Sequence, residues 1–208
     1  MHRRLLLIVL LGFLPFVGYA EKKTPHQIIQ VTAQQVLEVL KNDEAAIRKN
    51  PNKINELVDQ IILPVCDLEK MSKFILAKHW KTANDAQRVA FTNEFKIMLI
   101  RTYGKHMVEY SGAEITVLPE KNIEKKQYQT VNTELNLKNG SKPLLIAYVF
   151  RTTENTAKIV DVRVEGMSML RVFRTVFTYE IADTSLEELI ERMANYNRPA
   201  LAMNTLSN

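Results

Sequence analysis

Cysteine is nearly absent from this chain, which has only Cys66 among its 208 residues. A single thiol excludes an internal disulfide, so the hydrophobic core must supply the stability of the fold. Cys66 lies between Val65 and Asp67, next to a turn at Pro64. A nucleophilic cysteine requires a nearby histidine and oxyanion donors. We therefore predict that Cys66 is a buried, unreactive thiol.

Glycine and histidine are also scarce, and those present form no recognisable chemical motif. The six glycines provide neither a glycine-rich phosphate loop nor a nucleophile elbow. After the first twenty residues the histidines are His26, His79 and His106, and none has a histidine or carboxylate at the i, i+4 spacing of a helical metal site. We predict no metal ion, no cofactor and no enzymatic activity.

Neither sign of charge dominates the composition. The chain has 28 basic and 23 acidic residues. Without the first twenty residues, which contain two arginines and no acid, 26 basic and 23 acidic residues remain, a net charge of +3. This balance argues against a nucleic-acid partner and suits only brief contact with an anionic membrane surface.

A long apolar run occurs only at the N-terminus. Basic residues at 2–4 precede an apolar run over 5–17, small residues follow at 18 and 20, and charge resumes at Glu21. This order predicts a secretory signal peptide over residues 1–20, cleaved after Ala20. The run is too short for a membrane span, and no later run approaches that length.

Helical periodicity characterises both ends of the remaining chain. Apolar residues at steps of three and four predict helices over 24–40, 50–64, 67–80, 84–111, 168–177 and 185–193. Thr24, Asn84 and Ser185 are well placed as N-caps. We predict a single domain over 21–195, followed by a loosely ordered tail at 196–208.

Between these helices the apolar period changes to two. Alternation predicts strands over 115–119, 131–137, 146–150 and 158–165, with a hairpin turn at Asn139-Gly140. Regular spacing of strands and turns favours an antiparallel meander. The predicted fold class is therefore α+β: a bent antiparallel sheet of about four strands, with helices packed on one face and a helical block at the N-terminus.

Asp161 is the acid that stands out, because it lies among valines on the last predicted strand. By strict alternation it faces away from Val160, Val162 and Val164, so it is a solvated or salt-bridged acid. The alternative is a general base in a cone-shaped pocket, as in small steroid-isomerase-like folds of the NTF2 type.

Several segments together resemble the MlaC family, also called the toluene-tolerance auxiliary family, over about residues 25–195. The first set of matches is Asp67-Leu68, Met71-Ser72, Trp80-Lys81, Gln87, Phe91, Phe95, Leu99 and Tyr103. The second and more specific set is Asp161-Val162, Val164 to Ser168, and Arg174 with Phe177. The chain departs from the family pattern at Ala157, where tryptophan is common, around Asp183-Thr184, and at Ala77, where glycine is usual.

The resemblance implies a periplasmic, non-enzymatic, monomeric phospholipid carrier with a cystatin-like bent sheet. Such carriers pass lipid between an outer-membrane lipoprotein complex and an inner-membrane ABC transporter complex, which maintains the lipid asymmetry of the outer membrane. A hopanoid-related branch of the same superfamily is also similar. A structural adaptor with a filled core and the small-molecule enzyme using Asp161 are the other hypotheses. For Arg174 we weigh a phosphate contact against a salt bridge to Glu165 or Asp161.

Enclosing two acyl chains requires an apolar cavity of about 1,000 Å³, at the upper end of ligand sites. The apolar residues of the sheet's dry face and of the helices above it are the candidates for its lining. We predict lipid contacts from Phe74, Phe95, Leu99, Tyr103, Val131, Leu135, Tyr148, Phe150, Val162, Val164, Met167, Phe173 and Phe177.

Overall fold

A computed structural model describes residues 23–119, 127–137 and 139–205; the predicted signal peptide lies outside the described residues. One antiparallel sheet has the strand order β1-β2-β3-β4-β5, so each strand pairs with its neighbours in sequence. This meander confirms the predicted α+β class, with a two-residue fifth strand added after Gly166. The strands are β1 Glu114–Val117, β2 Tyr128–Asn136, β3 Leu144–Thr152, β4 Ala157–Val164 and β5 Met167–Ser168.

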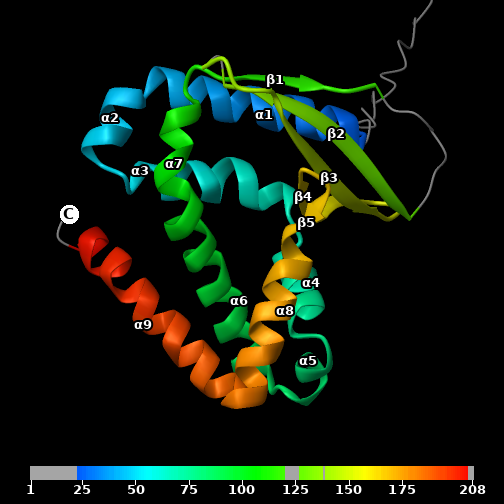
Figure 1. Cartoon of the computed structure of the whole chain (residues 1–208), viewed down its shortest axis with the longest axis vertical. Coiled ribbons are helices and arrows are strands. Elements are labelled where there is room, and N and C mark those ends of the chain that lie inside the picture. Colours follow the sequence, from blue (N-terminus) through cyan, green and yellow to red (C-terminus); the bar gives the residue numbers. More distant parts are fainter. Residues whose placement is uncertain (1–22, 120–126, 138, 206–208) are drawn as a thin grey trace, which may run out of the picture.

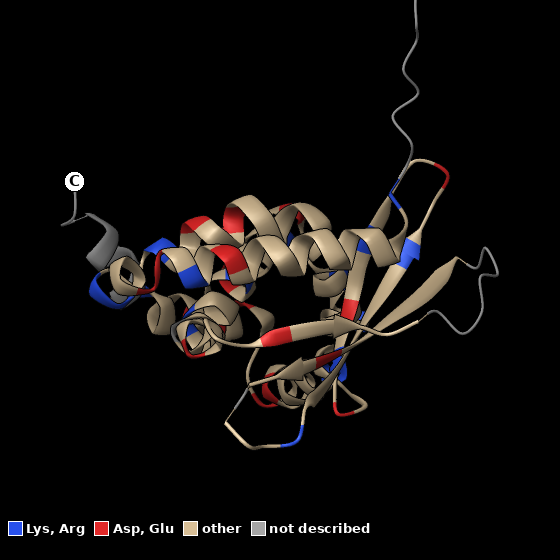
Figure 2. Ribbon diagram, turned by 90° about the horizontal axis from the view of Figure 1, so that it is seen from above, with Lys and Arg blue, Asp and Glu red and all other residues tan. Residues whose placement is uncertain are grey.

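Helices lie to one side of this sheet (Figures 1 and 2). The N-terminal helix α1 contacts β1 and β2, whereas α4 and α8 contact β4, and α9 runs beside α6. Acidic and basic segments are interspersed over the helices (Figure 2), as the balanced composition predicts. The α-helices are α1 Pro25–Asn42, α2 Glu44–Lys49, α3 Lys53–Leu57, α4 Leu68–Leu76, α5 Lys78–Thr82, α6 Asp85–Leu99, α7 Lys105–Met107, α8 Met169–Asp183 and α9 Leu186–Thr205.

Two of the predicted long helices contain wider turns. The predicted helix over 50–64 consists of α3, a π-helix η1 at Val58–Ile62 and a 3-10 turn η2 at Leu63–Val65. The predicted helix over 84–111 continues from α6 through a second π-helix, η3 at Ile100–Gly104, to α7 and a 3-10 turn η4 at Val108–Tyr110. Apolar spacing alone does not distinguish a π turn from an α turn, and π turns often mark functional sites.

The strict alternation predicted for β4 is wrong at Val160. The pairing of β3 with β4 shifts between Val149 and Phe150, which pair with Asp161 and Ile159 respectively. Val160 is therefore the extra residue of a β-bulge, and it lies on the same face as Asp161. Beyond the bulge, Val162 and Val164 return to the inner face, where Ile159 also lies.

Buried apolar side chains form two separate clusters. The main cluster joins the sheet to α4, α6, α8 and α9, and it contains four buried phenylalanines, of which Phe91, Phe95 and Phe150 are fully buried. The Phe95 ring meets Phe173 edge-on with centroids 5.2 Å apart. The N-terminal cluster includes Leu40, Ile47, Ile54, Leu57, Val58 and Val108. The hydrophobic interior is thus divided rather than continuous.

The C-terminal segment differs from the predicted loose tail, because α9 continues to Thr205. Asn197 is fully buried, and its Nδ2 donates to the Glu94 carbonyl at 3.0 Å and to Glu94 Oε2 at 2.6 Å. Asn197 lies in a polar stretch, so hydrophobic periodicity gives no indication that it is buried. Its buried amide nevertheless holds α9 against α6 through the hydrogen bonds to Glu94.

The predicted helix over 67–80 is split into α4 and α5 at Ala77. Ala77 has φ 50° and ψ −112°, a backbone conformation that favours glycine, because the side chain of an L-residue collides with the backbone there. Glycine is usual at this position in the family that the sequence resembles, and the geometry provides the physical reason.

Substituting Ala77→Gly is expected to stabilise the protein by about 1 kcal/mol. Relief of backbone strain of about 1–3 kcal/mol exceeds the entropic penalty of glycine, which is about 1 kcal/mol or less. The urea unfolding midpoint measures the change. Ala86→Gly, at an exposed position inside α6, is the matched control and should destabilise by about 0.5–1 kcal/mol. Destabilisation by both substitutions would contradict the assigned strain.

Candidate functional site: an apolar cavity between the sheet and the helices

An apolar cavity of about 370 Å³ separates the two buried clusters. Its walls come from the η1–α4 segment, from α6 through α7, from β4 and from the start of α8. The lining residues are Val58, Ile62, Leu63, Cys66, Leu68, Met71, Phe95, Lys96, Leu99, Ile100, Tyr103, Gly104, Met107, Val162, Val164, Met169, Leu170 and Phe173. Apart from Lys96 and the tyrosine hydroxyl, these groups offer a ligand only dispersion contacts and the exclusion of water.

Both π-helices line the cavity, η1 through Val58 and Ile62, and η3 through Ile100, Tyr103 and Gly104. η3 also lies close to α3, the helix before η1, because a Cβ added to Gly104 would lie 2.8 Å from Ile54 Cγ2 in α3. The absence of a side chain at Gly104 therefore lets η3 pack against α3 beside the cavity.

Six of the thirteen predicted lipid-contact residues line this cavity: Phe95, Leu99, Tyr103, Val162, Val164 and Phe173. The structure places the others elsewhere. Val131, Phe150 and Phe177 are buried in the main cluster, Leu135 of β2 is buried outside that cluster, and Tyr148 packs against the main cluster. Phe74 and Met167 are exposed, the latter by 61%.

The lining also includes residues that the sequence pattern did not single out, such as Val58, Ile62, Leu63, Met107 and Met169. The first three lie in the second half of the predicted helix over 50–64, which has the pattern of an ordinary amphipathic helix. Their position becomes clear only when the chain widens into η1 and turns at Pro64. The adjacent hydrophobic residues at 61–63 are a weak signal of such a segment, because a regular helix rarely buries three consecutive positions.

An ion pair crosses the rim of the cavity. Lys96 Nζ of α6 lies 3.2 Å from Asp59 Oδ1 of η1, and both side chains remain partly exposed. The nearby Tyr103 side chain is also exposed. The contact links two wall segments, and an exposed pair of this kind contributes little to stability.

Cys66 forms part of the wall opposite α6. Burial raises the pKa of its thiol to about 11, and the nearby Lys158 ammonium only partly offsets this effect. The thiol is therefore protonated at neutral pH and contributes to the apolar lining. Cys66 also forms a parallel bridge to Ile159, which fixes the start of α4 beside β4.

Asp161 does not line the apolar cavity and instead faces the other side of β4. Its Oδ1 accepts from the Leu170 backbone N–H at 3.4 Å, and its Oδ2 lies 3.7 Å from Arg163 Nε. Arg174 lies over the Phe74 ring, with the guanidinium carbon 5.3 Å from the centroid. The structure thus places both residues outside the cavity, on the outer surface around α4 and α8.

Within the described residues, no group of three or more His, Cys, Asp or Glu side chains is arranged to hold a metal ion. Nor is any helix in that part of the chain long and apolar enough to cross a bilayer.

Comparison with known proteins identifies the family. The family model described as MlaC protein matches residues 30–195. This chain belongs to the MlaC family. It is 30% identical over 172 residues to the toluene tolerance protein ttg2D of Pseudomonas putida, covering 82% of this chain and 79% of that protein. The intermembrane phospholipid transport system binding protein MlaC of Haemophilus influenzae is 23% identical over 168 residues, covering 80% and 78% respectively.

A solved structure confirms the fold of this MlaC-family chain. The phospholipid-binding protein from Ralstonia solanacearum, in complex with a phospholipid, superimposes with a TM-score of 0.78 at 20% sequence identity. The match covers 85% of this chain and 98% of that chain. The antiparallel sheet with its helices is therefore shared at 20% sequence identity.

The elevated pKa of Cys66 predicts slow alkylation of the folded protein. At pH 8 a thiol of pKa about 11 is roughly 0.1% ionised, against roughly a quarter for a thiol of ordinary pKa, so the reaction should be at least 100-fold slower than in urea. The rate should rise with pH until about pH 11. Iodoacetamide labelling followed by mass spectrometry measures it. Similar rates in folded and unfolded protein would contradict the placement of Cys66 in the cavity wall.

Proposed function

We propose that this protein is a periplasmic carrier that holds a phospholipid by its acyl chains in the apolar cavity. In this proposal it is not an enzyme, and it passes lipid between an outer-membrane lipoprotein complex and an inner-membrane ABC transporter complex. That transfer would maintain the lipid asymmetry of the outer membrane. The observation that carries the proposal is the cavity of almost entirely apolar lining between two hydrophobic clusters. Membership of the MlaC family supports it.

The names of similar proteins point the same way. The Haemophilus influenzae relative is named as a phospholipid transport binding protein, and the Ralstonia solanacearum structure contains a phospholipid. In this chain the equivalent ligand would need no specific polar contact inside the cavity. The head group would remain near solvent, on the side of Lys96 and Tyr103.

The energetics of transfer explain why both chains need shelter. Each methylene moved out of water contributes about 0.8 kcal/mol, so two ordinary acyl chains amount to on the order of 20 kcal/mol. A carrier that left one chain in water would withdraw lipid from a bilayer against roughly half of that. Enclosure of both chains makes extraction nearly neutral.

The cavity of about 370 Å³ is smaller than the value of about 1,000 Å³ expected for two chains. Its walls must therefore separate when a whole lipid enters. The rim between η1 and α6 is suited to such movement, because the Lys96–Asp59 pair that joins the two segments there is partly exposed and contributes little to stability. The two π-helices on this side add backbone that is less regular than an α-helix.

The proposal is tested by extracting the purified protein with organic solvent and identifying the lipids by mass spectrometry. We expect about one phospholipid per protein, either co-purified or taken up from vesicles. Folded protein that carries none and takes up none would contradict the proposal. Recovery of hopanoids alone would reassign the ligand.

Filling the cavity should abolish lipid uptake. In Val164→Trp, the indole occupies the space that an acyl chain requires, so lipid recovered after incubation with vesicles should fall at least tenfold. Leu145→Trp is the matched control, because Leu145 lies on the adjacent strand β3 and is exposed. It should bind lipid normally. Circular dichroism verifies that both variants are folded, and equal uptake by both would refute a cavity-bound chain.

A further inference from the structure

A second hollow, of about 580 Å³, lies on the opposite face of β4 from the apolar cavity. Alternation along β4 beyond the bulge at Val160 creates the division: Val162 and Val164 line the cavity, whereas Asp161 and Arg163 line the hollow. Leu170 at the start of α8 borders both. The two recesses are therefore adjacent, but their linings have opposite chemical character.

Basic side chains converge on this second recess, which we call the basic hollow, from four elements far apart in sequence. They are Lys70 and Lys73 of α4, Arg151 of β3, Arg163 of β4 and Arg171 of α8. Among the described residues that line the basic hollow, Asp161 is the one carboxylate. Such a concentration of one sign contrasts with the balanced charge of the whole chain.

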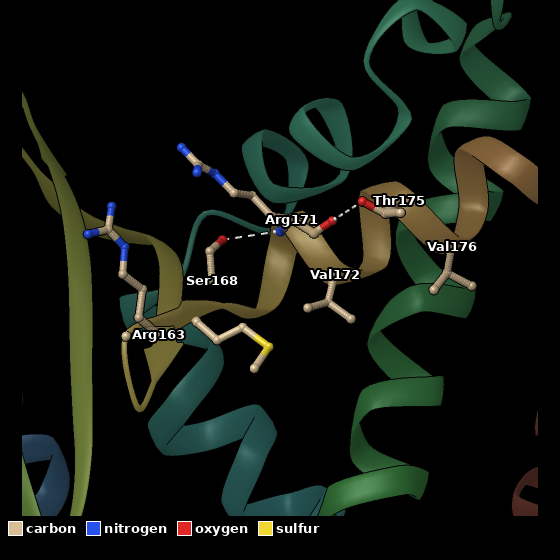
Figure 3. Close-up of a pocket in the computed structure, with 8 residues that line it drawn as sticks. Arg163, Ser168, Arg171, Val172, Thr175 and Val176 are labelled. Carbon is tan, nitrogen blue, oxygen red and sulfur yellow. Dashed lines mark hydrogen bonds between the residues drawn. The ribbon is translucent and has the colours of Figure 1, made fainter.

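The positive charge in the basic hollow is largely uncompensated. Asp161 is engaged by Arg163 and by the Leu170 backbone N–H. Within the described part of the chain, neither Lys70, Lys73, Arg151 nor Arg171 forms an ion pair. Figure 3 shows the Arg163 and Arg171 side chains extending to the same side of the α8 N-terminus, away from Val172 and Val176.

Exposed apolar side chains border these cations. Phe74 and Tyr128 line the basic hollow itself and are exposed by 40% and 54%. A free phosphate ion would use only the cations. The surface of an anionic bilayer would use both groups, because aromatic and aliphatic side chains favour the head-group region while Lys and Arg attract acidic lipids.

We propose that the basic hollow, with the exposed Phe74 and Tyr128 that line it, forms a docking surface for bilayers that carry anionic phospholipid. The cations bind lipid phosphate groups, and Phe74 and Tyr128 lie among the head groups. Docking in this orientation places the carrier on the membrane through a surface other than the acyl cavity. The inference goes beyond lipid carriage, and it would stand even if the cavity held a different ligand.

The test measures co-sedimentation with vesicles of phosphatidylglycerol and phosphatidylcholine in equal parts. Each Lys or Arg near such a surface strengthens binding about five-fold, so Lys73→Gln with Arg171→Gln should weaken it roughly 25-fold. The matched control is Lys41→Gln with Lys49→Gln, which removes the same charge at exposed positions of α1 and α2. It should change binding less than two-fold. Asp161→Asn, which removes the one acid, should strengthen binding.

Each alternative gives a distinct result. Equal weakening of both double variants would show that net charge alone controls binding, and it would overturn the proposal. Unchanged binding of the Lys73/Arg171 variant would also overturn it. If inorganic phosphate or polyglutamate bound at the basic hollow while vesicles did not, the site would belong to a free anion or to an acidic protein. Lipid uptake, measured by extraction in the same variants, should remain normal, which separates this result from a failure of the carrier function.

Discussion

The separation of two hydrophobic clusters is the constraint on which the rest of this structure depends. A chain of this size ordinarily closes its apolar side chains into one packed core. Here the main cluster on the sheet and the N-terminal cluster around Leu40 and Leu57 are separate, and the apolar cavity lies between them. The space between them has walls that cannot satisfy a polar ligand but can replace water around a hydrocarbon chain.

The two faces of β4 have opposite chemical character, and a bulge sets which residues each face receives. With Ile159 on the inner face, strict alternation without the bulge at Val160 would turn Asp161 and Arg163 inward as well. With it, Val162 and Val164 join the cavity, while Asp161 and Arg163 join the basic hollow. The same short strand therefore separates an apolar compartment from a charged surface, and Leu170, in the first turn of α8, borders both. The start of α8 is positioned by Ser168, whose Oγ accepts from the Arg171 N–H at 3.1 Å.

The sequence was sufficient to predict the order and type of most elements. The N-caps at Thr24 and Asn84 and the period-two strands are local signals, and the structure contains them close to the predicted positions. The bulge, the π-helices and the buried Asn197 were not predictable in this way, because each depends on pairing or packing between segments far apart in the chain. For the same reason, pattern alone did not separate Val162, which lines the cavity, from Phe150, which fills the core. Both are apolar residues on the inner face of one sheet.

The central claim is that an acyl chain lies between the sheet and the π-helical wall. A phospholipid with a spin label near the end of one acyl chain tests it most directly, through line broadening of methyl signals in the NMR spectrum of the complex. The account predicts strong broadening for Leu99, Val162 and Val164, and little for the outward-facing Leu145. Broadening confined to surface residues such as Leu145, with the cavity signals unchanged, would contradict it.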